Sequence, residues 1–264
     1  MQVKIICLNV QAQIRRVHPV QNIFPNATIN QAVDMRNVSA EKLLQEKMIT
    51  TSAFESIKNG RKYHHEMSSA AAAGLSLSVL NMLNEGEGPI LICEDDCIPS
   101  PKLPHVIRKL LALSSEFDMA IFGPIYYEHD QSDIPFPLKG FDRLNKYYWG
   151  NHALYFTEAG RQKAIAHLQP PYDVQIDAHF SRLSMYADFR AIIQFSSPPL
   201  ATQTLHISTV QTDLCPMCDL HPNASRNAVI NLSLPSVTLI CLLVLVLLYK
   251  KELKDFYKKK GVHA

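Results

Sequence analysis

The sequence predicts an α/β domain built on an open, mostly parallel sheet with helices on both faces, followed by a C-terminal transmembrane helix. Short apolar runs rich in β-branched residues alternate with longer segments of helical spacing, the pattern of a parallel sheet covered on both sides. At 264 residues, the chain is long enough for one such domain with a complete core. A run of 22 residues without a charge stands near the C-terminus.

The predicted elements follow one another in chain order. The run "VKIICLNV" predicts a first, central strand, and the polar stretch 11–30 predicts a loop with a weak helix. Ser39 is the predicted N-cap of the next helix, and the alanine-rich start of a later one allows close packing. We expect further strands at 89–93, 117–123 and 151–157, helices at 39–48, 67–84, 101–114, 158–168 and 174–185, and a long loop at 124–140.

The uncharged run, residues 228–249, can cross a hydrocarbon core of roughly 30 Å as a helix. A buried core helix is the alternative, but six lysines in the last fifteen residues favour a membrane span. We expect a domain at 1–215, a linker at 216–227, a transmembrane helix at 228–249 and a basic tail at 250–264. The chain is therefore predicted to be a single-pass protein with a C-terminal anchor, in an endomembrane or in a viral or bacterial envelope.

Two signals for the orientation of this anchor conflict. Lysines after the span predict a cytosolic tail and a body on the lumenal or outer side. The opening "MQVKIICLNV" lacks the regions of a signal peptide, which predicts a tail anchor with a cytosolic body. Both orientations stay open.

Charge and cysteine content exclude two classes of protein. Outside the basic tail there are 20 basic and 22 acidic residues, so no basic groove for nucleic acid is predicted. The six cysteines are scattered, and Cys215 and Cys218 form a single C-x-x-C without the second pair that a structural zinc site needs. We therefore expect neither a nucleic-acid partner nor a disulfide framework.

Three adjacent acids, Glu94, Asp95 and Asp96, directly follow the apolar strand at 89–93. In open α/β sheets, ligands collect at the carboxyl ends of the strands. Three like charges repel one another, so a divalent cation that neutralises them makes the arrangement favourable. Oxygen ligands suit Mn²⁺ or Mg²⁺, and a site with few protein carboxylates leaves positions for the phosphates of a nucleotide diphosphate. The alternative is a plain solvated turn.

Six segments stand in an order and at spacings that resemble one known family. The first strand ends in "LNVQAQIRR", with Asn9 and Arg16 in register, and "MSSAAAAGLSLSV" and "LICEDD" follow. Later come "GNHALYFTEAGRQKAIAHL", "VQIDAHF" with Asp177, and "PPLATQTLHISTVQTD" with Gln203. Over roughly residues 2–215 the chain is similar to glycosyltransferase family 25, which includes lipopolysaccharide-biosynthesis transferases and procollagen galactosyltransferases.

This resemblance implies a GT-A type fold and a glycosyltransferase, which the predicted span at 228–249 would anchor in a membrane. Such an enzyme moves a hexose, galactose or glucose, from a UDP-sugar to a hydroxyl of a glycan or protein acceptor. The resemblance implies that Mn²⁺ or Mg²⁺ is held by Glu94 and Asp96, and that the donor is bound by Asn9, Arg16, Glu94 and Asp95. The alternative for Arg16 is a surface arginine beside Arg15.

The resemblance also implies residues for catalysis. Transfer with inversion needs a carboxylate that takes the proton of the acceptor hydroxyl. Asp177 is the candidate and Asp173 the second choice; a helix-start acid stabilised by the macrodipole is the alternative for Asp177. His152 and Tyr155 are candidates for the acceptor cleft, although a strand tyrosine is often a core residue. The "YHHE" stretch predicts a polar loop, and a place over the donor is its functional alternative.

Two positions depart from the family pattern. The family has a glutamate where this chain has the run Ala70 to Ala73, and a histidine where Val79 follows Ser78. The alternative function is therefore a catalytically degenerate, membrane-anchored binding or scaffold protein of the same fold.

Overall fold

The computed structural model describes residues 1–8, 14–127, 129–130 and 133–203, with the side chains of 14–16 left out. The chain divides into two units, Met1–Leu220 and His221–Ala264, and the second lies wholly outside the described residues. No helix in the described part of the chain combines the length and apolar character that crossing a membrane requires. The predicted span at 228–249 falls outside that part, and so does Asp213, which the family resemblance also matches at the end of "PPLATQTLHISTVQTD".

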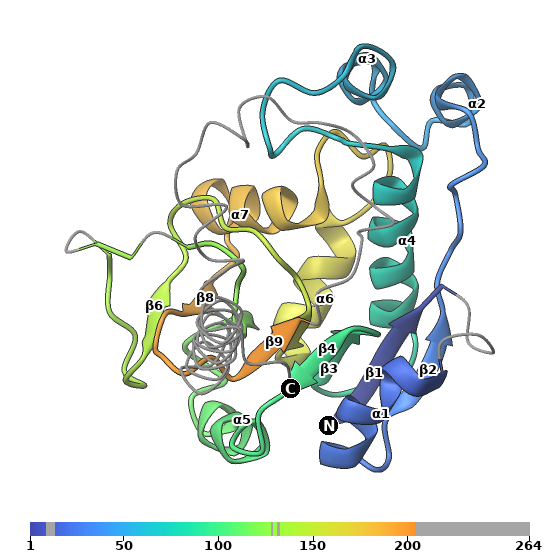
Figure 1. The fold of residues 1–264 in the computed structure, drawn as a ribbon. Coiled ribbons are helices and arrows are strands. Elements are labelled where there is room, and N and C mark those ends of the chain that lie inside the picture. Colours follow the sequence, from blue (N-terminus) through green and yellow to red (C-terminus); the bar gives the residue numbers. More distant parts are fainter. Residues whose placement is uncertain (9–13, 128, 131–132, 204–264) are drawn as a thin grey trace, which may run out of the picture. The chain divides into compact units, whose positions relative to one another are not determined.

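Seven strands form the central sheet in the order β2-β1-β3-β7-β5-β8-β6 (Figure 1). Strand β1 pairs in parallel with β2 and β3, and β5 with β8. Strand β7 is antiparallel to β3 and β5, and β6 is antiparallel to β8, so five strands share one direction. The bounds are Gln2–Cys7 (β1), Thr28–Gln31 (β2), Ile90–Glu94 (β3), Met119–Ile121 (β5), Phe141–Arg143 (β6), Ala153–Phe156 (β7) and Ala191–Gln194 (β8).

The predicted α/β fold with a mostly parallel sheet is thus confirmed, but the sheet is mixed. The antiparallel strand β7 lies in its middle, which hydrophobic patterning does not reveal because a buried strand reads alike in either direction. The helices are Ile14–Ile23 (α1), Ala40–Gln45 (α2), Thr51–Asn59 (α3), Ala70–Asn84 (α4), Leu103–Leu111 (α5), Glu158–His167 (α6) and Ile176–Tyr186 (α7). The weak helix predicted within 11–30 occurs as α1, whereas helix α3 and strands β2, β6 and β8 were not predicted.

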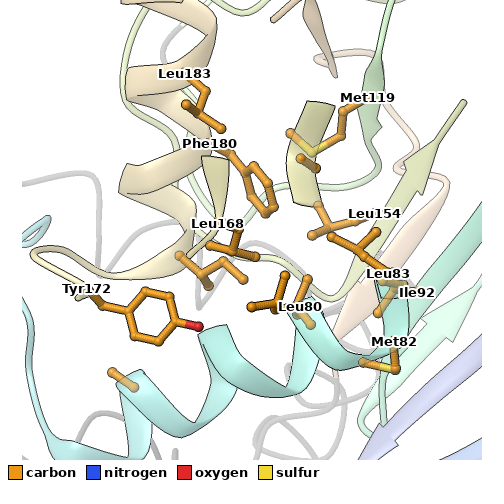
Figure 2. Close-up of a cluster of buried hydrophobic side chains, with 14 of the residues drawn as sticks. Leu80, Met82, Leu83, Ile92, Met119, Leu154, Leu168, Tyr172, Phe180 and Leu183 are labelled. Carbon is orange, nitrogen blue, oxygen red and sulfur yellow. The ribbon is translucent and has the colours of Figure 1, made fainter. Parts of the chain in front are cut away.

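Successive residues of each strand point to opposite faces, so each face has its own core. On one face, Ile92 and Leu154 pack with α4, α6 and α7, and Figure 2 shows Leu80, Leu168 and Phe180 in this cluster. On the other face, buried residues of β1, β3 and β7 pack with α1 and α5. Helices therefore cover both faces, as the sequence predicts.

Close packing of α4 depends on its small residues. Ser69 caps the helix by accepting a hydrogen bond from the Ala72 amide. Within the helix, a Cβ added at Gly74 would lie 2.5 Å from the Val33 carbonyl oxygen, so a larger residue does not fit there.

A second, two-stranded sheet lies directly beyond β3. Strand β4, Cys97–Pro99, pairs antiparallel with β9, Ala201–Gln203, and Cys97 stands opposite Gln203. The Ser100 amide also donates to the Leu200 carbonyl at 2.8 Å. This pairing brings the last described segment of the chain to the acidic turn.

Candidate active site

The three acids lie at the carboxyl end of β3, where the prediction places them. Glu94 is the last residue of β3 and stands opposite Ile6 of β1, while Asp95 and Asp96 form the turn into β4. Glu94 and Asp95 are half-buried, and Asp96 is buried at 9 % exposure. Because β1 and β3 are parallel, their carboxyl ends meet at this edge, which is where α/β sheets bind ligands.

A residue far along the chain orients the buried acid of this turn. Gln203 Nε2 donates a hydrogen bond of 2.7 Å to Asp96 Oδ2. The pairing of β4 with β9 sets this contact, since Gln203 is the partner of Cys97 in the small sheet. The structure therefore joins two residues that the family resemblance matches separately.

His152 lies beside the same turn because β7 runs antiparallel to β3. Its carbonyl accepts a hydrogen bond of 3.1 Å from the Glu94 amide, and its Nε2 donates to the Gly123 carbonyl. Burial lowers the pKa of His152, against the opposing effects of the Gly123 carbonyl and the Asp96 charge. With 1 % of its surface exposed, this acceptor-cleft candidate is a buried neighbour of the acids.

Asp177 lies in the first turn of α7 and is buried, with 6 % exposure. Its Oδ1 accepts a hydrogen bond of 2.8 Å from the Ala178 amide, and the Gly150 amide also donates to this carboxylate. Burial raises its pKa from 3.8 to about 6, although these amide donors and the Arg61 charge act in the opposite direction. A carboxylate with this pKa suits a general base near neutral pH.

The charges of Asp177 and of the acidic turn both act on Tyr148. The residue is fully buried, and its hydroxyl donates to Asn151 Oδ1. Burial raises the pKa of this hydroxyl, and the charges of Asp177 and Glu94 raise it further. One phenol is thus influenced by two carboxylates that are far apart in sequence.

Asp173, the second choice for the base, has a different environment. Its side chain is 42 % exposed and pairs with the Arg182 guanidinium. Arg182 Nε also donates to the Tyr147 hydroxyl at 3.3 Å. Asp173 is thus held in an ion pair at the surface, whereas Asp177 is buried and accepts hydrogen bonds from backbone amides.

Aromatic rings gather beside Asp177 in a cluster that we call the aromatic wall, and which consists of His64, His65, Tyr126, Tyr147 and Trp149. Trp149 stacks on Tyr126 with 4.3 Å between ring centroids and contacts His64 at the same distance. His65 stacks on Tyr147 at 5.1 Å. Burial lowers the pKa of His64 to about 4, so its ring is neutral at pH 7.

The aromatic wall is held against the start of α7. The Gln175 amide donates to the His65 carbonyl at 3.2 Å, and the Gln175 side chain donates to the His64 carbonyl. Arg61, itself buried, donates to the His64 carbonyl at 3.0 Å. The predicted polar loop "YHHE" therefore packs on the segment 147–149. The run "KYYWGN" is the signal that points to this segment, since adjacent aromatic residues before a glycine are unusual in a plain loop.

Three further site predictions have the following positions. Tyr155 is fully buried and packs near Phe117, which is the core position named as its alternative. Asn9 lies outside the described residues. Arg16 belongs to α1, and its side chain is among those left out.

Among the described residues, a group of three metal-ligand side chains with mutually close atoms occurs at His129, Asp133 and Asp142, not at the acidic turn. Glu94 and Asp96 nevertheless suit a hard divalent ion chemically, because carboxylate oxygens are its preferred ligands. Two protein carboxylates are enough where a diphosphate supplies further oxygens.

The fold and this site define a mixed α/β protein with an acidic turn, a buried carboxylate and an aromatic wall at one edge of its sheet. No family model and no curated protein matches the chain. Among solved structures, UDP-glucose pyrophosphorylase complexed with UDP-glucose matches at 11% identity and a TM-score of 0.38, over 75% of this chain and 91% of that one. Mouse xyloside xylosyltransferase 1, in its apo form, matches at 10% identity and a TM-score of 0.31, over 64% and 71%. Scores of this size assign neither a family nor a site.

Proposed function

We propose that this protein is a membrane-anchored, metal-dependent glycosyltransferase that moves a hexose from a UDP-sugar to a hydroxyl of a glycan or protein acceptor. One observation carries the proposal: the charges of Glu94, at the end of β3, and of the buried Asp177 both raise the pKa of the buried Tyr148. This arrangement provides the two carboxylate functions that the reaction needs, one for a metal-bound diphosphate and one for a proton.

In the proposed reaction, Asp177 accepts the proton of the acceptor hydroxyl as that oxygen forms a bond to the anomeric carbon. The bond from this carbon to the diphosphate oxygen breaks, and its electron pair leaves with UDP. Glu94 and Asp96 would hold Mn²⁺ or Mg²⁺, which would neutralise the departing phosphate as a Lewis acid. Gln203 keeps the Asp96 carboxylate oriented.

The aromatic wall is the proposed support for the acceptor. Aromatic rings bind the apolar faces of sugar rings, and the partly exposed Tyr147 and Trp149 are the candidates for this contact. The Gly150 amide, next to Trp149, donates to Asp177, so the ring and the proposed base are fixed by adjacent residues.

A test of this function measures release of UDP from UDP-galactose and UDP-glucose by the full chain, with and without Mn²⁺. We expect slow, metal-dependent hydrolysis without an acceptor and faster release with one. Absence of release from either donor, with or without a glycan or hydroxylysine acceptor, would exclude the proposal for these sugars.

A second candidate function is a non-catalytic binding or scaffold protein of the same fold. The observation that favours it is the first turn of α4, where Ala70, Ala72 and Ala73 are buried at the position of the family glutamate. This turn offers no carboxylate to a donor. Donor binding without UDP release in the assay above would support this second function.

The proposed anchor is the segment 228–249. Because its 22 residues carry no charge, we expect the full chain to stay with membranes during extraction with alkaline carbonate. A chain that ends before Asn227 is the control and should be released. Full-length protein in the soluble fraction would contradict the anchor.

A further inference from the structure

A second group of ligand side chains lies on the loop between β5 and β6 and on the edge strand β6. His129 Nδ1 is 3.1 Å from Asp133 Oδ2 and 2.7 Å from Asp142 Oδ2. The three ligand atoms all lie within 4.8 Å of one another. One cation of ordinary size could therefore contact all three after small side-chain movements.

Two of these ligands are buried carboxylates. The side chains of Asp133 and Asp142 are 0 % and 3 % exposed. Asp133 Oδ2 accepts a hydrogen bond of 2.9 Å from the Asp130 amide. Asp142 Oδ2 has no partner with hydrogen-bond geometry among the described residues, despite its short distance to His129 Nδ1. A buried carboxylate oxygen without a donor is costly, and a bound cation would remove that cost.

In the described part of this loop and strand, the acids of the cluster outnumber the lysine that pairs with them. Lys146 Nζ lies 2.8 Å from Asp133 Oδ1 and 3.1 Å from Asp130 Oδ2. One ammonium group thus neutralises part of the charge of two acids. Asp142 forms its ion-pair contact, within the described part of the chain, with His129. A divalent cation would complete the charge balance of the group.

The imidazole of His129 is held in place by a neighbouring ring. It stacks on Phe195 with 4.0 Å between centroids and 4° between ring planes. Phe195 directly follows β8, so the sheet fixes the plane of the imidazole, with Nδ1 directed at the two acids. Metal-binding histidines are commonly oriented by such outer contacts.

This cluster is separate from the acidic turn. Asp142 of β6 is paired with Ile193 of β8. Successive pairs across β5 and β7 lead from Ile193 to Ile92 of β3, which lies two residues before Glu94. Four strand spacings of about 4.8 Å put the two sites roughly 19 Å apart. A single ion cannot serve both.

We propose that His129, Asp133 and Asp142 bind one divalent ion of the first transition series, of which zinc is the best probe. One imidazole nitrogen and two carboxylates suit such an ion better than Mg²⁺ or Ca²⁺, which prefer oxygen ligands alone. The ion ties the loop to β6. Tyr126 of this loop stacks on Trp149, so the ion also steadies one side of the aromatic wall.

The test measures zinc bound by the full chain in detergent, together with the visible absorption of a cobalt-loaded sample. We expect one equivalent at this site in the parent, and a loss of zinc affinity of roughly 100-fold or more in His129→Gln and in Asp142→Asn. His105→Gln, an exposed histidine on α5, is the matched control and should bind zinc as the parent does.

Two further variants make the outcome decisive. Lys146→Gln should tighten zinc binding, because it removes an ammonium that competes for Asp133. If the cluster is only an ion-pair network, that variant binds no zinc and the proposal fails. Asp96→Asn should still bind zinc at the His129 cluster, whatever its effect on donor binding. The zinc site and the proposed transferase function are therefore tested separately. A parent that binds no zinc, or that loses it equally in His105→Gln, would overturn the site.

Discussion

Replacing Asp177 by asparagine is expected to lower the rate of sugar transfer by at least about 100-fold while donor affinity stays unchanged. The carboxylate is proposed to act on the acceptor proton in the transition state, so its loss does not weaken ground-state binding of the UDP-sugar. Its buried position and its pKa of about 6 favour this role over a surface helix acid. The measurement is the transfer rate and the donor dissociation constant of the parent and the variant.

Asp173→Asn is the matched control for this prediction. Asp173 lies four residues earlier and is partly exposed in its ion pair with Arg182, so we expect a much smaller loss of transfer. If both variants lose little transfer activity, and to the same extent, Asp177 is not the base. Its role would then be structural, as the acid that links α7 to the Gly150 amide. A larger loss in Asp173→Asn would move the base to that residue.

The stability of the Asp177→Asn variant provides a second readout. The folded protein holds the Asp177 proton up to about pH 6, whereas the unfolded chain releases it near pH 3.8. Stability therefore falls as the pH rises from about 4 to 6, by up to about 3 kcal/mol once the buried group is ionised. Asparagine lacks this penalty but loses one amide hydrogen bond.

We therefore expect the melting temperature of the variant, relative to the parent, to rise between pH 4.5 and pH 8. Thermal unfolding followed by circular dichroism at both pH values checks this. A relative melting temperature that does not change with pH would show that Asp177 does not titrate in this range, and would remove one reason for assigning it the role of base.

The second large effect is expected at the acidic turn. Asp96→Asn should abolish donor binding that depends on Mn²⁺, because the amide keeps the shape of the side chain and loses the charge that the metal needs. Gln203 can still donate to the remaining oxygen, so the turn should stay folded. Calorimetric titration of UDP-sugar with and without Mn²⁺ measures the effect, which we expect to exceed roughly 100-fold.

Asp188→Asn is the control, since the Asp188 side chain is 90 % exposed and lies after α7. It should bind the donor as the parent does. If Asp96→Asn binds the donor as the parent does, with the same dependence on Mn²⁺, then this acid holds no metal. The acidic turn would then be a plain solvated turn in which Gln203 donates a hydrogen bond to the buried Asp96.

Much of the fold follows from the sequence because local patterning is strong in a buried α/β sheet. The runs before Glu94 and around Ala120 and Leu154 are apolar and short, and strands β3, β5 and β7 occur there. The helix capped by Ser39 begins where the sequence predicts, and α4, capped by Ser69, begins three residues after its predicted start at Met67. The acids occur where an apolar strand ends, at the carboxyl edge that a ligand site requires.

Only the tertiary structure decided which distant residues meet at that edge. The direction of β7 brings His152 to the acids, the pairing of β4 with β9 brings Gln203 to Asp96, and the fold brings Tyr148 near Asp177. No local pattern encodes these contacts, because strand direction, register and burial are set by the whole sheet. The sequence alone determined the residue types and their places on strands and helices. Burial, which raises the pKa of Asp177 and leaves Asp142 short of a donor, arises only when the complete core excludes water.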